Sequence, residues 1–212
     1  AQQHDMVVRG HTLVWHQCLP AWVSKGTFSR DEAIQVLHDH ISTVVGRYKG
    51  RVPIWDVVNE AIDDNGSGLR DTPWRRLIGD DYVEIVFRFA HEADPDALLF
   101  YNDYSTEGLN AKSDAVYKMV QDLVARGVPI NGVGLQSHFT VGEMDTVGIA
   151  ANMKRLGELG LQVQITEMDD RYPVNSTDAI LQPQAGDYRK LLATCLDSSY
   201  CTAFVTWGVN DL

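Results

Sequence analysis

The sequence is short of basic residues and of long apolar runs, and both shortages exclude classes of protein. Among 212 residues, 18 Lys and Arg stand against 29 Asp and Glu, so the formal net charge is −11. Nucleic acid or an anionic membrane would require a basic face, and we expect neither as a partner. No apolar run is long enough to cross a membrane. At 44% hydrophobic and 22% charged, residues 1–212 are predicted to form a single globular domain with a sizeable core.

Several chemical signatures are absent as well. No G-x-G-x-x-G or P-loop pattern follows the first expected strand, which argues against a nucleotide-binding sheet. There is no H-x-H, no H-E-x-x-H and no cysteine pair at ligand spacing, and His11 and His16 would lie on opposite faces of one strand. We therefore expect no metal and no cofactor. G-x-S-x-G is also missing, so a serine nucleophile is unsupported.

Cysteine is scarce, with three residues in the chain. Cys195 and Cys201 flank "LDSSY" between a helix-like run and a strand-like run, a spacing that allows a short-loop disulfide. Two small buried thiols are the alternative, and composition leaves both open. Two sequons, at Asn65 and Asn175, lie in loop-like sequence and favour secretion.

Strand-like and helix-like runs alternate along the chain. Apolar, β-branched runs occur near 7–15, 52–58, 97–101, 130–135, 161–165 and 203–207. Amphipathic stretches with helical spacing lie at 30–48, 80–93, 111–126, 149–159 and 184–197, the first preceded by Ser29 as a helix cap. This α/β alternation predicts parallel βα units, arranged either as an open doubly wound sheet or as a (β/α)8 barrel.

Polar side chains follow nearly every expected strand. They are His16-Gln17, Asn59-Glu60, Asn102-Asp103-Tyr104, Gln136-Ser137-His138, Glu167 with Asp169, and Asn210-Asp211. A barrel collects the carboxyl ends of its strands around one mouth, where barrel enzymes keep their chemistry. The pattern favours a (β/α)8 TIM barrel that is incomplete here, because six of the eight strands can be identified.

Glu60 and Glu167 are the glutamates that end strands, each in an otherwise apolar context. Two carboxyl groups in different environments can divide roles, one protonated as a general acid and the other ionised. Glycoside hydrolysis uses such a pair. The alternative is that both glutamates are solvated or cap helices.

Aromatic and amide side chains near the strand ends favour a sugar as the ligand. The aromatic residues are Trp15, Trp22, Tyr104 and Trp207, and the amides include Asn59 and Gln136. Aromatic faces can stack on pyranose rings, and amides suit a ligand covered in hydroxyl groups. For any single tryptophan, packing in the core is the more frequent fate.

Six segments of the chain resemble, in order, the signatures of glycoside hydrolase family 10. They are "RGHTLVWHQCLPAWV" (9–23), "WDVVNEAIDD" (55–64), "LFYNDYSTEG" (99–108), "GVGLQSHF" (132–139), "ITEMDDR" (165–171) and "VTWGVND" (205–211). The resemblance extends through essentially the whole chain. It implies a (β/α)8 barrel and a retaining endo-1,4-β-xylanase that acts on xylan or xylo-oligosaccharides.

The resemblance also implies a role for each catalytic residue. Glu60 matches the acid/base catalyst of the family, and Glu167 matches its nucleophile. Asn59 matches the amide that binds the sugar 2-hydroxyl group, a contact expected to strengthen in the transition state. His138 resembles the imidazole that holds the nucleophile, with Asp169 behind it to set its tautomer.

The substrate-binding residues follow from the same resemblance. His11, Trp15, Gln136 and Trp207 look like walls of the −1 subsite, and Tyr104 looks like a platform on the aglycone side.

Cys195 and Cys201 fall where many family members have a disulfide, which implies a secreted, extracellular enzyme. We expect it to be monomeric. Cys18 departs from the family, because it stands where a sugar-binding glutamine is usual.

Against the family pattern, the chain begins at the third strand and ends just after the eighth. The expectation is a single catalytic domain, truncated at both ends relative to the family, whose open barrel leaves strand edges unpaired. Two alternatives remain: a carbohydrate-binding or inactive fragment of such an enzyme, and another β-1,4-glycanase, such as a cellulase, on the same barrel.

Overall fold

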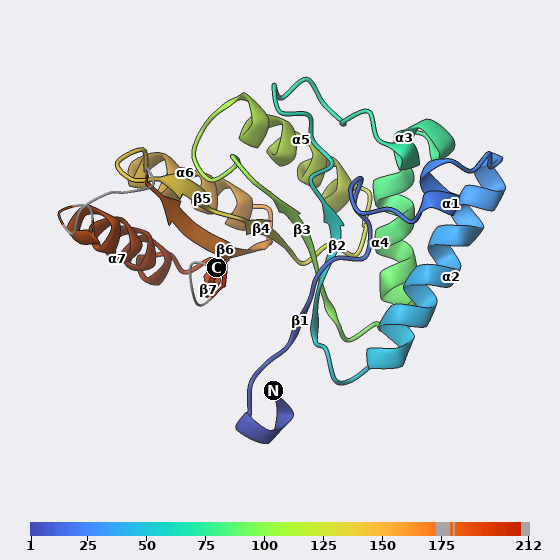
Figure 1. The fold of residues 1–212 in the computed structure, drawn as a ribbon, viewed down its shortest axis with the longest axis horizontal. Coiled ribbons are helices and arrows are strands. Elements are labelled where there is room, and N and C mark those ends of the chain that lie inside the picture. Colours follow the sequence, from blue (N-terminus) through green and yellow to red (C-terminus); the bar gives the residue numbers. More distant parts are fainter. Residues whose placement is uncertain (173–178, 180, 209–212) are drawn as a thin grey trace.

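The computed structural model of the chain describes residues 1–172, 179 and 181–208. Helices and strands alternate through this part of the chain (Figure 1). The strands are β1 (Arg9–Gly10), β2 (Ile54–Asn59), β3 (Leu98–Asp103), β4 (Gly132–Leu135), β5 (His138–Thr140), β6 (Gln162–Arg171) and β7 (Cys201–Thr206). The α-helices are α1 (Ala21–Ser24), α2 (Arg30–Tyr48), α3 (Pro73–Ile78), α4 (Tyr82–Ala93), α5 (Ala111–Ala125), α6 (Thr146–Gly157) and α7 (Leu181–Asp197), and a 3-10 turn, η1, spans Gln2–His4.

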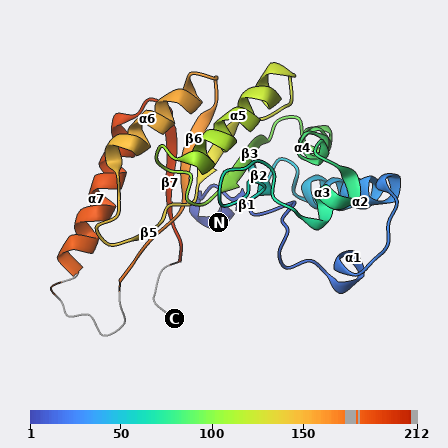
Figure 2. The same cartoon turned by 90° about the horizontal axis from the view of Figure 1, so that it is seen from above.

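All strand pairs named in the sheet are parallel. The order across the sheet is β1-β2-β3-β4-β6-β7, and β5 pairs with the carboxyl-terminal part of β6. Figure 2 shows the helices in an arc around the outer side of these strands, with the inner side open. The sheet is therefore an arc of a (β/α)8 barrel, and the carboxyl ends of its parallel strands lie at the same end of the arc.

A polar contact crosses the inner side of the arc. The Arg9 guanidinium on β1 donates to both carboxylate oxygens of Asp56 on β2 and to Oε1 of Gln164 on β6. The same guanidinium lies 4.8 Å from the centre of the Phe100 ring. Asp56 is 1% exposed, so its charge requires a partner such as Arg9. Arg9 thereby links β1 to β6 across the interior.

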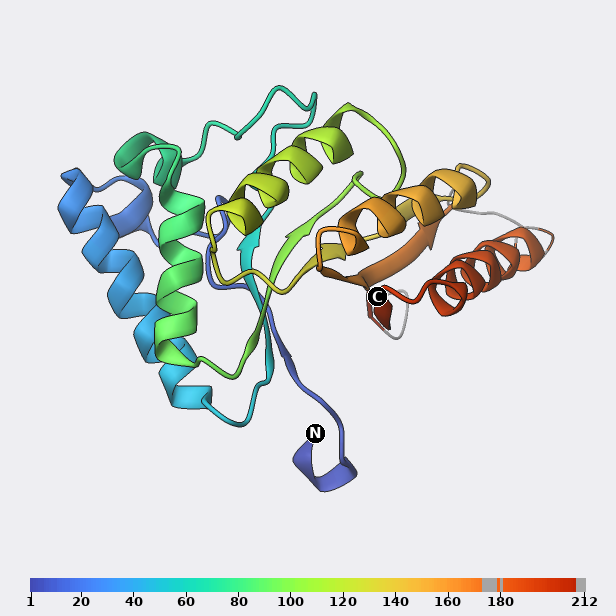
Figure 3. The same cartoon turned by 180° about the vertical axis from the view of Figure 1, so that it is seen from behind.

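Helix α2 shows how the outer layer forms. It begins at a capping box, in which Ser29 and Glu32 satisfy each other's backbone N–H groups. Its buried residues are Ala33, Leu37, Ile41 and Val45, one stripe at a spacing of four residues. Each large side chain in the stripe contributes about 1.5–3 kcal/mol by leaving water. Helix α2 packs against α4, and the two helices run side by side in Figure 3.

The six expected strands and five expected helices are confirmed, with shifts at their ends. The first strand is the largest difference, since within 7–15 only Arg9–Gly10 is strand. Leu13 and Val14 nevertheless donate backbone hydrogen bonds to Asp56 and Val57 at the neighbouring β2. The apolar run thus stays beside the sheet without regular pairing. The short elements α1, α3 and β5 were not predicted.

The remaining sequence features are placed as follows. Cys195 and Cys201 form a disulfide between the end of α7 and the start of β7, whereas Cys18 is a free, exposed thiol. The Asn65 sequon is exposed in a loop, and Asn175 and Asn210-Asp211 lie outside the described residues. Across the described residues, no helix combines the length and apolar character that crossing a membrane would require.

Candidate active site

Parallel pairing brings the strand-end residues into one ladder. The Glu60 N–H donates to the Asn102 carbonyl at 2.9 Å, and the Glu167 N–H donates to the Gln136 carbonyl at 3.0 Å. Asn59 stands beside Asn102 in the register of β2 and β3. Side chains from β2, β3, β6 and the segment after β4 therefore gather at one end of the sheet, as the strand-end pattern predicts.

The carboxylate of Glu60 accepts three hydrogen bonds. Trp15 Nε1 donates to Oε2 at 2.8 Å, while Asn59 Nδ2 and Gln136 Nε2 each donate to Oε1 at 3.1 Å. Glu60 is 7% exposed, and its φ angle of 59° lies in the left-handed region. The backbone turns sharply at this residue, immediately after β2, and directs the side chain into the cluster.

Within the described part of the chain, the carboxylate of Glu167 has two partners. Oε1 accepts from Asn102 Nδ2 at 2.8 Å, and Oε2 lies 3.3 Å from His138 Nε2. His138 Nδ1 lies 2.8 Å from Oδ1 of Asp169. The hydrogen bond to Glu167 raises the pKa of His138; burial opposes this shift, and Asp169 adds to it. A protonated imidazole donates to both carboxylates and fixes the orientation of Glu167.

The two glutamates are joined through two amides. Asn102 Nδ2 donates both to Glu167 Oε1 and, at 2.9 Å, to Asn59 Oδ1, and the Asn59 amide nitrogen donates to Glu60. Glu167 is 5% exposed, so both carboxylates lie in a protected environment. The structure thus brings together the carboxylate pair that the sequence predicts.

His11 and Trp207 border the pair on the side of Glu167. The His11 ring lies 6.4 Å from the Trp207 ring and the His138 ring 6.0 Å from it, both edge to face. Trp207 is 56% exposed, and part of its surface remains free for a ligand. Burial lowers the pKa of His11, but the hydrogen bond and charge of Asp56 outweigh it and the net shift is upward.

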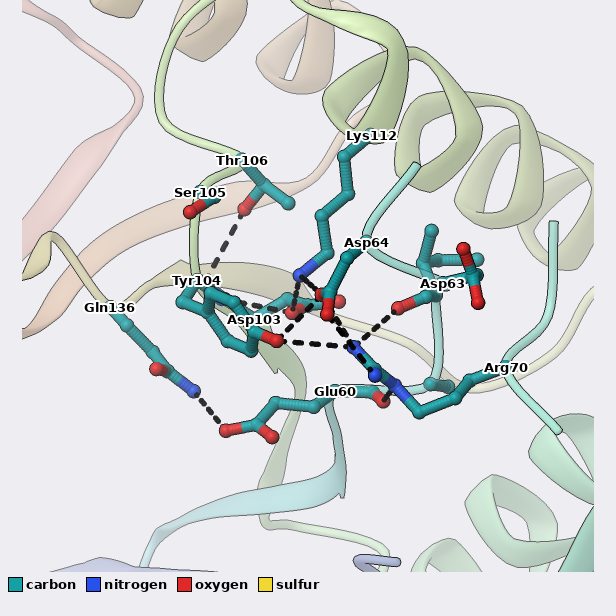
Figure 4. Close-up of polar contacts among 12 residues, drawn as sticks. Glu60, Asp63, Asp64, Arg70, Asp103, Tyr104, Ser105, Thr106, Lys112 and Gln136 are labelled. Atoms are coloured by element: carbon teal, nitrogen blue, oxygen red, sulfur yellow. Dashed lines mark hydrogen bonds and ion pairs between the residues drawn. The ribbon is translucent and has the colours of Figure 1, made fainter. Parts of the chain in front are cut away.

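Tyr104 is connected to the backbone of Glu60 through Arg70, which donates hydrogen bonds to the Tyr104 hydroxyl and to the Glu60 carbonyl (Figure 4). Its hydroxyl donates to Asp64 at 2.6 Å, and Lys112 Nζ lies 3.4 Å from the ring centre. The phenol is therefore held in a fixed orientation at the edge of the cluster. Apart from the two disulfide cysteines, all ten predicted site residues are thus found around one cluster, although within the described residues Tyr104 forms no hydrogen bond with the carboxylate of Glu60 or Glu167.

A largely apolar groove of about 770 Å³ adjoins the cluster on the side of β1. His11 and Trp15 line both the groove and the site, and Cys18 and Trp22 line its rim together with residues of α2. Trp22 is 59% exposed. Cys18 is exposed and lines this groove instead of filling the core.

The sequence places Asn102 among the strand-end polar residues but does not identify its role between the two carboxylates, and it does not identify Asp56 as part of the site. Asn102 lies near the end of β3 in "FYND", as Asn59 does at the end of β2 in "DVVN". Asp56 is inside β2, where a carboxylate in an apolar strand is itself unusual. Among the residues described here, no group of His, Cys, Asp and Glu is arranged to hold a metal ion.

The arrangement suits chemistry that needs two carboxylates. One can transfer a proton while the other, held by an imidazolium and an amide, can form a covalent bond or stabilise positive charge. The surrounding Trp, His and amide groups match a ligand that presents both hydroxyl groups and apolar ring faces.

The comparisons with known proteins agree with this geometry. The model of Glycosyl hydrolase family 10 matches residues 1–212. Endo-1,4-beta-xylanase B of Thermotoga neapolitana is 46% identical over 212 residues, which are 100% of this chain and 61% of that protein.

Two solved structures are also similar. Xylanase 10B from Thermotoga petrophila RKU-1 in complex with xylobiose has a TM-score of 0.95 and 45% identity, covering 98% of this chain and 63% of that one. TsXylA, an intracellular xylanase from Thermoanaerobacterium saccharolyticum, solved as a variant with xylotriose, has a TM-score of 0.91 and 39% identity, covering 97% of this chain and 67% of that one. The chain thus spans less than two thirds of the two Thermotoga proteins.

Proposed function

The chain belongs to glycosyl hydrolase family 10, and from that premise we propose that it cleaves internal β-1,4-xylosidic bonds of xylan with retention of anomeric configuration. The observation that carries this proposal is the continuous link from Glu60 through Asn59 and Asn102 to Glu167. It couples two buried carboxylates at the strand ends, where barrel enzymes act. The named xylanases that match the chain support xylo-oligosaccharides as its substrates.

In the first step, a Glu167 oxygen attacks the anomeric carbon of the −1 sugar. The bond from that carbon to the glycosidic oxygen breaks, and Glu60 gives its proton to the departing oxygen. The product is an ester between Glu167 and the glycone. In the second step, Glu60 takes a proton from water as the water attacks the same carbon, so that Glu167 is released and two inversions leave the configuration retained.

The other residues support these two steps. We assign Asn59 to the sugar 2-hydroxyl group, and His138 with Asp169 to the orientation of Glu167. His11, Trp15, Gln136 and Trp207 form the wall of the −1 subsite, and Tyr104 forms the platform for the aglycone. Since Asn59 and Gln136 already point at Glu60, a bound sugar would share donors that are preorganised.

A slow-reacting substrate tests the nucleophile. A 2-deoxy-2-fluoro xylobioside with a dinitrophenyl leaving group should label the protein on Glu167 and inactivate it. Glu167→Ala should take up no label and lose roughly 10⁴-fold or more in kcat on xylan. Glu92→Ala, at an exposed position on α4, is the matched control and should label normally. Mass spectrometry of the peptides reads the result, and a labelled Glu167→Ala would rule out the assignment.

Substrate choice separates this proposal from its alternatives. Hydrolysis of xylan faster than of carboxymethylcellulose supports a xylanase, and the reverse order supports a cellulase. Binding of xylan without hydrolysis by a folded protein would indicate a binding-only protein.

We also propose that the protein is secreted and monomeric. The Cys195–Cys201 disulfide supports an oxidising compartment. TsXylA shows that a xylanase of similar structure can be intracellular, so cell fractionation decides the compartment and size-exclusion chromatography the assembly.

A further inference from the structure

Lys112 is a buried cation that the proposed reaction does not use. It lies in the first turn of α5, and its side chain is 3% exposed. Its Nζ lies 2.9 Å from Asp103 Oδ1 and 3.2 Å from Asp64 Oδ1, over the ring of Tyr104. Figure 4 shows the side chain reaching down from the helix to the carboxylates next to Glu60. A buried charge is costly even when it is paired, and an apolar residue would generally stabilise the fold as well or better.

One arm of contacts runs from Lys112 to the backbone that follows Glu60. Asp103 has 0% exposure; one of its oxygens faces Lys112, and the other accepts from the Tyr101 hydroxyl. The Tyr101 oxygen in turn accepts from the N–H groups of Ala61 at 3.0 Å and Ile62 at 3.1 Å. Burial raises the pKa of Asp103, and the charge of Lys112 opposes that shift. Lys112 therefore favours the ionised Asp103 that accepts from Tyr101.

A second arm runs through Asp64 to the carbonyl of Glu60 itself. Asp64 Oδ1 lies 2.7 Å from Arg70 Nη2, and Arg70 Nε donates to the Glu60 carbonyl at 3.3 Å. The hydrogen bonds from Arg70 and Tyr104 lower the pKa of Asp64 well below its ordinary value. Asp64 thus remains a carboxylate between Lys112 and Arg70.

Both arms end on a backbone that needs support. Glu60 has φ of 59°, a left-handed conformation that is unfavourable for a residue with a side chain and persists only where its surroundings fix it. Its N–H is held by Asn102, its carbonyl by Arg70, and the next two N–H groups by Tyr101. The direction of the Glu60 carboxyl group follows from this turn, and a shift of about 1 Å can cost a catalytic group about 100-fold in rate.

We propose that Lys112, through Asp103–Tyr101 and Asp64–Arg70, is a positioning residue that holds the backbone of Glu60 so that its carboxyl group can protonate the leaving group. The inference rests on the proposed function, because it takes Glu60 as the proton donor. It goes beyond that function by assigning the charged cluster outside the carboxylate pair to one of the two catalytic groups.

The test is Lys112→Met in the protein expressed at the full length of its reading frame. Lys118→Met, on the exposed side of the same helix, is the matched control. The substrates are a dinitrophenyl and a phenyl β-xylobioside, and kcat/KM is measured because it covers substrate binding and the departure of the leaving group but not hydrolysis of the glycosyl-enzyme. The dinitrophenyl group needs little protonation, and the phenyl group needs much.

We expect Lys112→Met to lower kcat/KM about 10- to 100-fold on the phenyl substrate and by less than about 3-fold on the dinitrophenyl substrate. Lys118→Met should leave kcat/KM unchanged on both substrates. Tyr101→Phe removes only the hydroxyl between Asp103 and the backbone, and it should reproduce the selective loss. Lys112→Arg, which keeps the charge, should recover part of it. An equal loss on both substrates, or none, would overturn the proposal, since loss of structure alone does not distinguish leaving groups.

Glu60→Ala, measured beside these variants, tests the acid role of Glu60 separately from the positioning role of Lys112. If Glu60→Ala lowers kcat/KM selectively on the phenyl substrate but Lys112→Met and Tyr101→Phe do not, Glu60 is the acid and the positioning role is wrong. If Glu60→Ala itself shows no selectivity, the proposed role of Glu60 fails and the inference fails with it. Should Lys112→Met not fold by circular dichroism, Tyr101→Phe decides the outcome.

Discussion

Asn102 sits between the two carboxylates, and a glycine makes room for it. A Cβ atom added at Gly134 would lie 2.3 Å from Asn102 Oδ1 and 2.8 Å from a methyl group of Thr166. Thr166 donates to the same oxygen at 2.7 Å and so fixes which end of the amide faces Glu167. Gly134 therefore leaves the space that Asn102 occupies, although a glycine inside a strand generally weakens that strand.

Asp170 carries a prediction about pH at the scale of one residue. It is 4% exposed, and within the described part of the chain neither of its oxygens has a hydrogen-bond partner. Burial, with the charges of Asp187 and Asp169, raises the pKa of Asp170 from 3.8 to about 6. A carboxyl group whose pKa is raised by folding binds its proton more tightly in the folded state, so it favours folding at low pH. That contribution is lost as the pH rises from about 4 through 6.

Asp170→Asn should therefore raise the melting temperature at pH 8 and change it little at pH 4. Asp96→Asn, at an exposed position, is the control and should be neutral at both. Calorimetry at the two pH values checks this, and a lower melting temperature for Asp170→Asn at pH 8 would show that the ionised carboxylate stabilises the fold.

At the scale of elements, long periodic segments were predictable and short ones were not. Helix α2 was predictable from Ser29 as its cap and from apolar residues repeated every four positions. Its bounds, Arg30–Tyr48, are those expected. Helices α1 and α3 span four and six residues, too few for a periodic signal. Strand β5 has three residues and exists because it pairs with a distant part of β6. Pairing of that kind is tertiary and leaves no local pattern.

The disulfide between α7 and β7 also carries a prediction. The loop it closes is short, with a sequence separation of six residues, so restricting the unfolded chain should contribute about 2 kcal/mol. The double variant Cys195→Ala, Cys201→Ala should lose about that much free energy of unfolding in urea.

Cys18→Ser is the control for that experiment, because Cys18 is free and exposed, and it should leave the free energy of unfolding unchanged. A double variant as stable as the parent would mean that the bridge adds nothing to the folded state.

At the scale of the whole molecule, the barrel class followed from polar residues at successive strand ends, and the pairing of Glu60 with Glu167 followed from the same pattern. The long-range contacts around the pair could not be predicted. Arg9 and Gln164 form a hydrogen bond although they are 155 residues apart in the sequence, and Lys112 and Asp64 form one although they are 48 residues apart. Such contacts depend on how far the sheet curves, which no single segment encodes.

The most direct test of the account is the release of reducing sugar from xylan by the protein, expressed at the full length of its reading frame, beside Glu167→Ala, with circular dichroism on both. We predict release by the parent, release lower by about 10⁴-fold or more for the variant, and identical spectra. Equal release by the two proteins would contradict the role of Glu167. No release by a well-folded parent would contradict the xylanase itself.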